Sequence, residues 1–199
     1  MEFSKALDQI AEIHAQIAKG EVYRGWRPLP VALSGVAGLG AAWLQPRTLG
    51  AADPVGFVLY WIAVAAACAL VGSGEIVYSY AMNGSDYDRR RTRRVVAQFA
   101  PSLGAGAVVT AVSVRLSAAL VALLPGLWAI FFGIGIFACR PYLPRASGWV
   151  AFYYWCAGAW LLWVADGVLP LRPWAVGGTF GAGQLLAALV LYWNLERHE

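Results

Sequence analysis

Charged residues are scarce in this sequence: they make up 13% of its 199 residues, whereas 60% of the residues are hydrophobic. An ordinary soluble domain has about 25% charged residues. Windows of 19 to 24 residues without any Asp, Glu, Lys or Arg lie at 28–46, 54–74, 95–114, 116–139, 146–165 and 173–195. Because roughly 20 helical residues cross a bilayer, the composition excludes a soluble enzyme, a secreted disulfide scaffold and a disordered chain.

Histidine is almost absent, and the two that exist, His14 and His198, lie outside these windows. This excludes an intramembrane bis-histidine haem, an HExxH metalloprotease and a membrane Ser–His pair. The three cysteines form no CxxC motif and are expected to be small buried hydrophobic residues. We therefore expect no catalytic residue, no metal site and no cofactor.

The predicted fold is an all-α polytopic membrane protein with six transmembrane helices, preceded by a cytoplasmic amphipathic helix. Residues 1–27 form the amphipathic helix and an interfacial belt, and residues 28–199 form a single transmembrane domain. The spans are expected at about 28–45, 55–81, 95–114, 116–139, 148–166 and 173–193.

The N-terminal segment shows helical periodicity, because Leu7, Ile10, His14 and Ile17 follow one another at spacings of three or four residues. Four acidic and two basic residues lie between positions 2 and 21. Helices that lie on anionic lipid are usually rich in Lys and Arg. We therefore expect this helix to dock on protein rather than on the membrane surface.

Basic residues indicate the orientation. With a cytoplasmic N-terminus and alternating spans, twelve Lys and Arg residues fall on the cytoplasmic side, and only Arg47 and Arg172 fall outside. The positive-inside rule therefore places both termini in the cytoplasm.

The boundary between the third and fourth spans is ambiguous, because Arg115 and Pro125 both interrupt the apolar run. Either the turn lies at Arg115 and Pro125 kinks a long fourth helix, or Pro125 begins that helix after a short interfacial segment. We favour the first alternative. The preceding "NGSDYDRRRTRR" is expected to be a turn followed by a basic loop.

Small residues recur at four-residue spacing and predict close helix packing. The candidate packing positions are Ser34, Gly38, Gly106, Gly177, Gly181 and Gly183.

Four polar residues near the spans are candidates for function. Glu75 is either a proton or cation site, or one member of a structural pair. Arg115 is expected to reach the outer headgroups or to pair with Asp166. Gln184 is explained either by a hydrogen bond between helices or by substrate binding.

A run of arginines precedes the third span and is either a topological signal or a site for anionic lipid or an acidic partner. It comprises Arg89, Arg90, Arg91, Arg93 and Arg94. Nucleic acid is not expected as a partner, because the run has almost no interleaved aromatic residues.

The segments "AEIHAQIAKGE", "RPLPVALSG" and "PWAVGGTFGAGQLLAALVLYW" resemble a group of small, functionally uncharacterised bacterial integral membrane proteins with a short cytoplasmic N-terminal helix. Some members are encoded beside a small winged-helix regulator. The resemblance implies an inner-membrane location and a signalling context, and it implies no active-site residue.

Two functions are compatible with these features. The first is a non-enzymatic, sensor-like or regulatory subunit that acts through a protein partner or a second copy of itself. The alternative is a small transporter or channel for an ion, solute or lipid that uses Glu75. A polar cavity that reaches Glu75 would favour the transporter.

Overall fold

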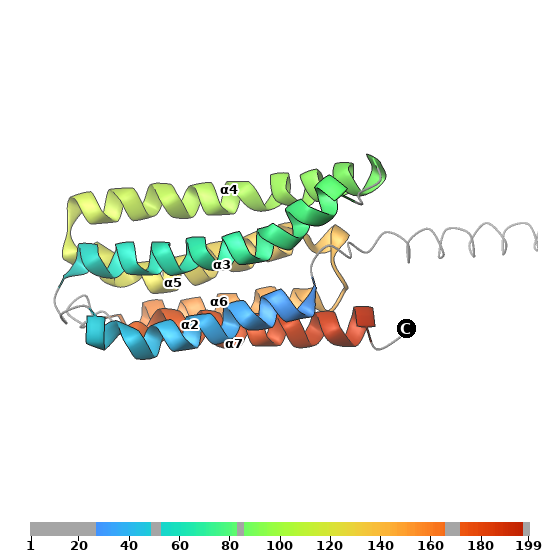
Figure 1. Ribbon diagram of the computed structural model, residues 1–199. Helices are drawn as coiled ribbons and strands as arrows, with labels where there is room; N and C mark the ends of the chain where they lie inside the picture. The colour runs from blue at the N-terminus through green and yellow to red at the C-terminus, as the bar shows by residue number, and fades with distance from the viewer. Residues whose placement is uncertain (1–26, 49–52, 83–85, 166–171, 197–199) are drawn as a thin grey trace, which may run out of the picture.

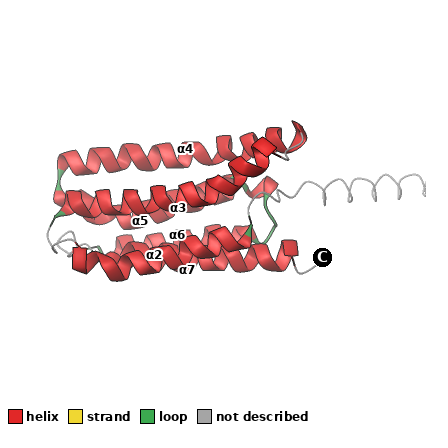
Figure 2. Cartoon of the chain, in the orientation of Figure 1, coloured by secondary structure: helices red, strands yellow, loops and turns green. Residues whose placement is uncertain are grey.

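The computed structural model describes residues 27–48, 53–82, 86–165 and 172–196. These residues are almost entirely helical, and no strand occurs among them (Figure 2). The predicted helix at 3–20, with Leu7, Ile10, His14 and Ile17, lies outside the described residues.

Six long helices run side by side and form an elongated bundle (Figure 1). They are α2 (Pro28–Thr48), α3 (Pro54–Met82), α4 (Asp86–Leu116), α5 (Ala118–Ala138), α6 (Ser147–Trp163) and α7 (Pro173–Leu191). A short 3₁₀ turn, η1 (Arg140–Tyr142), precedes α6, and a π-helical turn, η2 (Tyr192–Glu196), extends α7. Each long helix contains most or all of one charge-free window, and α3 and α4 extend beyond theirs.

Proline marks the beginning of three helices: α2 at Pro28, α3 at Pro54 and α7 at Pro173. Proline suits the first helical position because its φ angle is already helical and its missing N–H would have no partner there. Before α3, the Asp53 carboxylate accepts a hydrogen bond from the backbone N–H of Val55 at 3.0 Å. Local chemistry therefore fixes these helix starts.

The turn between α4 and α5 consists of Ser117 alone. Its hydroxyl oxygen accepts a hydrogen bond from the backbone N–H of Leu120 at 3.3 Å, which caps α5. Pro125 lies inside α5. The position of the turn, beside Arg115 and with Pro125 inside the helix that follows, agrees with the first of the two predicted alternatives, whereas the kink at Pro125 stays a prediction.

The basic run is helical, and the prediction of a loop there was wrong. Residues 86–94 form the first turns of α4, which begins nine residues before the predicted third span. Arginine is a good helix former, and Asp86 and Asp88 stand where a helix N-terminus favours negative charge. These turns continue into the apolar part of α4 after residue 95, whose packing stabilises the helix as a whole.

Among the residues that the structure describes, four helices are long and apolar enough to cross a membrane: Pro54–Gly72, Thr92–Leu116, Ala118–Ala138 and Pro173–Asn194. The prediction of six such helices is therefore supported for four. α6 has only 17 residues, fewer than a typical span of roughly 20. α2 has 21 residues, but two N-terminal prolines, several glycines and Gln45 lower its mean hydropathy. The protein is thus an all-helical bundle with the character of a membrane protein.

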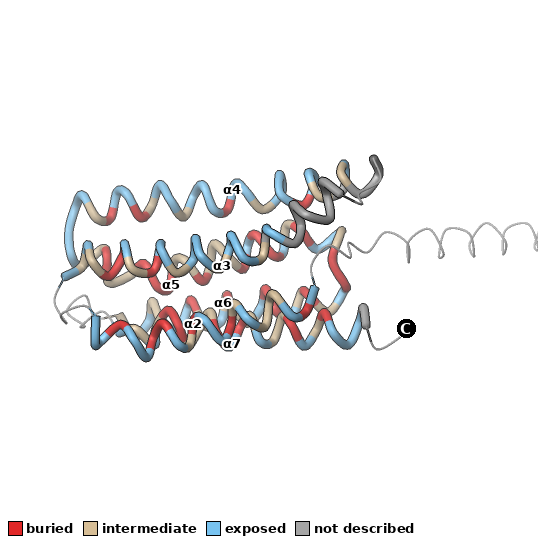
Figure 3. The backbone as a smooth tube through the Cα atoms, viewed as in Figure 1, coloured by how far each residue is buried: buried red, intermediate tan, exposed pale blue. Residues whose placement is uncertain are grey.

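Burial is uneven across the bundle, as Figure 3 shows. One cluster of buried side chains lies between α4, α5 and α6 and includes Val95, Ile136 and Tyr154. A second lies between α2, α3, α5 and α7 and includes Trp61 and Leu124. By contrast, only 17% of the residues in the apolar window of α3 are buried. The two clusters together draw on all six long helices, and α3 is the most loosely attached of the four apolar helices.

Candidate functional site

The helices alternate in direction, and this places the described arginines unevenly on the two ends of the bundle (Figure 1). We call the end where α2 begins and α7 finishes the basic end; it carries Arg27, Arg89, Arg90, Arg93, Arg94, Arg140 and Arg145. The opposite end carries Arg47, Arg115 and Arg172.

A cleft opens near the basic end, between the pair α2–α7 and the pair α5–α6. Its volume is about 70 Å³, which is room for a few water molecules. A site for a drug-sized ligand has roughly 300–1,000 Å³. The lining is Val31, Phe132, Ile136, Leu143, Ser147, Val150, Gln184, Ala187 and Leu191. The cleft is therefore narrow and mainly apolar.

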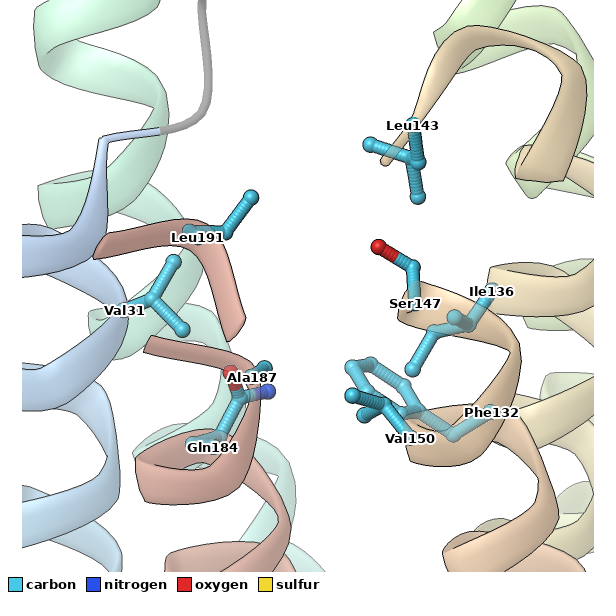
Figure 4. Close-up of a pocket in the computed structure, with 9 residues that line it drawn as sticks. All are labelled: Val31, Phe132, Ile136, Leu143, Ser147, Val150, Gln184, Ala187 and Leu191. Carbon is cyan, nitrogen blue, oxygen red and sulfur yellow. The ribbon is translucent and has the colours of Figure 1, made fainter. Parts of the chain in front are cut away.

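Two polar side chains lie on opposite walls of this cleft (Figure 4). Ser147 stands at the start of α6, and Gln184 lies on α7 in the opposite wall. Neither side chain forms a hydrogen bond with any of the described residues. Because an unpaired amide in an apolar setting is unfavourable, the cleft is ready to receive hydrogen-bonding groups from a ligand or from water. The hydrogen bond between helices suggested for Gln184 is not seen in the described part of the chain.

Two exposed arginines lie in the segment that joins α5 to α6, and neither belongs to the lining of the cleft. Arg140 folds back over the start of α6: its Nε lies 3.6 Å from the position that a Cβ on Gly148 would occupy. Arg145 lies two residues before Ser147, and the backbone N–H of Gly148 donates to its carbonyl at 3.2 Å. The Cζ atom of Arg140 also lies 5.8 Å from the centroid of the Phe137 ring, so this guanidinium lies over residues of α5 and α6 that do not line the cleft.

The other polar candidates lie elsewhere. Glu75 belongs to α3, but its side chain lies outside the described residues, as does Asp166 entirely. Arg115 lies exposed in the last turn of α4, at the end opposite to the cleft. The proposed pair of Arg115 with Asp166 and the role of Glu75 therefore remain predictions. Arg115 is not among the residues that line the cleft.

The arginine run lies along the first turns of α4, on the basic end but away from the cleft lining. Arg90, Arg93 and Arg94 are exposed and Arg89 is half-buried, while the side chain of Arg91 lies outside the described residues.

Glycines bring α2 and α7 into backbone contact. A Cβ on Gly177 would lie 2.5 Å from both the carbonyl oxygen of Gly38 and the Cβ of Ala42. A Cβ on Gly181 would lie 2.6 Å from Cγ of Leu39. These positions leave no room for a side chain, which is how small residues allow helices to approach.

The remaining packing candidates differ from one another. Gly183 faces the ring of the fully buried Tyr154, whereas a Cβ on Gly106 would meet only Phe131, at 3.9 Å. Ser34 donates its hydroxyl hydrogen to the carbonyl of Val31 in its own helix at 2.7 Å. Ser34 and Gly106 thus do not occupy tight contacts between helices.

Several important positions were not identified from the sequence. Gly35, rather than Ser34, faces α7, and Gly126 and Gly158 meet where α5 crosses α6. The buried Gln45 accepts a hydrogen bond from Nε1 of Trp61 at 2.9 Å, which joins α2 to α3. Ser147 gained significance only from its position in the lining of the cleft. The polarity of Gln45 within an apolar window was a usable signal, but nothing in the sequence named its partner.

No protein-family model, curated protein or solved structure matches this chain. The interpretation of the site therefore rests on its own geometry.

Proposed function

We propose that this chain is a six-span protein of the bacterial inner membrane, with both termini in the cytoplasm, and that it acts through a protein partner as a sensor-like or regulatory subunit. In this proposal α2 and α6 cross the membrane together with the four more apolar helices. The basic end of the bundle faces the cytoplasm, as the positive-inside rule requires.

The aromatic residues of α6 support its assignment as a span. Trp149 and Phe152 are exposed near its start, and Trp160 and Trp163 are exposed near its end. Tryptophan is enriched at both membrane interfaces, where its ring lies at headgroup depth. Trp149 and Trp163 lie 14 positions apart, which corresponds to about 21 Å along a helix. This short helix therefore fits a span with an aromatic belt at each end.

The observation that carries the partner function is the outer face of α3. Ala63, Ala66 and Ala67 are exposed there, and a Cβ on Gly74 would meet nothing within 4 Å. Small residues on a helix face permit the close approach of a second helix. The loose attachment of α3 leaves this face available to a partner span in the bilayer.

Photo-crosslinking in intact membranes tests this proposal. A photoreactive residue at Ala66 should yield a discrete adduct with a partner protein or with a second copy of the chain. The same residue at Leu189, which is 53% exposed on α7, is the matched control and should react mainly with lipid. Equal, diffuse reactivity at both positions would contradict the partner function.

The substitution Glu75→Gln distinguishes the transporter alternative from the partner function. If Glu75 carries a proton or cation, this substitution removes the titratable charge while keeping the shape, so ion or solute flux into proteoliposomes should fall sharply without loss of stability. If Glu75 is a structural partner, thermal stability should fall first, since the other member of a buried pair loses its counter-charge. We expect no flux attributable to Glu75.

A further inference from the structure

The cleft between α2–α7 and α5–α6 ends inside the bundle. Along α7 its lining runs from Leu191, at the basic end, to Gln184, seven positions earlier, which corresponds to about 10 Å of helix. Tyr154 on α6 and Phe180 on α7 each lie one helical turn farther from the basic end than the last lining residue of their helix. Their ring centroids lie 5.0 Å and 5.4 Å from that of Phe132, which lines the cleft. These packed rings close the inner end, so the cleft is a recess that begins at the basic end.

Ser147 is the polar group in the recess that is most strongly buried. Only 4% of this residue is exposed, and its hydroxyl points into the cleft (Figure 4). The amide of Gln184 lies half-buried on the opposite wall. Neither group has a hydrogen-bond partner among the described residues, and burial without a partner is unfavourable for both. A hydroxyl and an amide can each donate and accept, so the recess suits a ligand that does both.

We infer that this recess holds a small cluster of water molecules that hydrogen-bond to Ser147 and Gln184. Its volume is about 70 Å³, and one water molecule takes about 30 Å³ in the liquid, so roughly two molecules fit. The lining residues include no ionisable side chain, so nothing in the recess selects an ion. A hydrocarbon chain would leave both polar groups unpaired. Water satisfies both groups and fits the volume.

The water cluster would extend the polar connection between α6 and α7 to the basic end. Deeper in the bundle, the hydroxyl of Tyr153 donates to the carbonyl of Thr179 at 3.0 Å, and that of Tyr154 donates to the carbonyl of Phe180 at 3.4 Å. At the level of the recess, water takes the place of such direct hydrogen bonds. A bridging water is nearly as favourable in enthalpy as a direct bond.

Oxidation by hydroxyl radicals tests for this water. A short X-ray pulse produces radicals from water, and they oxidise the side chains that lie beside it. Phe132 lines the recess, whereas Phe131, its matched control, lies near Gly106 of α4 and is also half-buried. In the full chain in detergent, tandem mass spectrometry should find Phe132 oxidised severalfold faster than Phe131. Equal rates would overturn the inference.

Filling the recess should remove the water. Ala187→Leu adds bulk inside the lining and should lower the oxidation rate of Phe132 to that of Phe131. Ala182→Leu makes the same change at an exposed position of α7 and should leave the rate unchanged. Val31→Leu fills the recess from α2 and replaces Ala187→Leu if that variant does not fold. An undiminished rate in the filled variant would place the water elsewhere and contradict the inference.

Removal of the polar groups tests what holds the water. The double variant Ser147→Ala/Gln184→Leu should lower the oxidation rate of Phe132 severalfold, because an apolar recess of this size gives water no partners. An unchanged rate would show that these two groups do not bind the water. A small organic molecule in the recess would instead shield Phe132 and add a fixed mass in native mass spectrometry, and this result would also overturn the inference.

This inference goes beyond the proposed partner function and does not rest on it. The oxidation measurement in detergent requires neither crosslinking at α3 nor a known topology. Absence of the Ala66 adduct would therefore leave the hydrated recess intact, and a dry recess would leave the partner function intact.

Discussion

At the scale of single residues, the contact between α2 and α7 is asymmetric. A Cβ at Gly177 would lie 2.5 Å from the backbone carbonyl oxygen of Gly38, which cannot move without shifting the whole helix. A Cβ at Gly38 would lie 3.7 Å from the nearest atom, the backbone nitrogen of Gly181, which is an ordinary contact distance. Two glycines that face the same interface therefore have very different tolerance for a methyl group.

Gly177→Ala should destabilise the bundle by about 1–3 kcal/mol, the usual cost of overpacking a filled interface. Gly38→Ala is the matched control and should leave stability unchanged or raise it slightly, because alanine is the better helix former. Both substitutions change helix propensity equally, so the difference between them isolates packing. Thermal unfolding of the purified protein in detergent measures it, and equal melting temperatures would contradict the geometry.

Residue spacing predicted where small residues cluster but not which ones touch. The four-residue stripe of Ser34 and Gly38 indicates a face of a helix, but the helix can rotate by one residue and still bury a small-residue stripe. The structure buries Gly35 rather than Ser34. Rotation depends on the partner, in this case on Leu185 and Gly181 of α7, which lie about 150 residues away in the sequence. Local patterns carry no information about such distant contacts.

At the scale of helices, the boundary between α4 and α5 depends on one serine. α4 ends at Leu116 and α5 begins at Ala118, so the chain reverses within a single residue. The extended backbone of Ser117, at φ −167° and ψ 153°, orients its hydroxyl toward the first N–H groups of α5. The first turn of a helix has unpaired N–H groups, and a side-chain acceptor satisfies one of them.

Ser117→Ala should therefore reduce stability by about 0.5–2 kcal/mol, because the cap is lost while the side-chain volume changes little. Ser117→Asp keeps an acceptor at the cap and should restore stability close to that of the natural chain. Chemical denaturation followed by circular dichroism in mixed micelles measures both variants. If the alanine and aspartate variants were equally stable, capping would not explain the sharp turn.

Helix positions were largely predictable because they follow from composition. Each charge-free window became one helix, since long apolar runs and helix-starting prolines are local features. The start of α4 was not predicted, because a run of arginines suits either an exposed loop or an exposed helix. The arginine run is helical because it continues directly into the helix after Val95. A hydrogen bond from Sγ of Cys139 to the carbonyl oxygen of Val95, at 3.4 Å, helps hold that helix against α5.

At the scale of the whole molecule, the arrangement of the ends follows from the alternation of the helices. Antiparallel neighbours return the chain to the same two ends, so the arginines of distant loops gather on one of them. The cleft could not be predicted from the sequence, because its lining comes from four helices and one connecting segment. Its polar members, Ser147 and Gln184, are 37 positions apart and share no motif. Only the packed bundle brings them together.

The orientation of the bundle in the membrane gives the last prediction. Ser117 and Pro141 are both exposed, and they lie at opposite ends of α5. Cys68, Cys139 and Cys156 are first replaced so that each new cysteine reacts alone. Ser117→Cys should then react with a membrane-impermeant maleimide in intact cells, whereas Pro141→Cys should react only after permeabilisation, because the basic end faces the cytoplasm. Labelling after permeabilisation controls for sites that are merely shielded, since a buried position stays unreactive in both conditions. Reaction of Pro141→Cys from outside, with Ser117→Cys protected, would invert the topology and place the arginine-rich end outside, against the positive-inside rule.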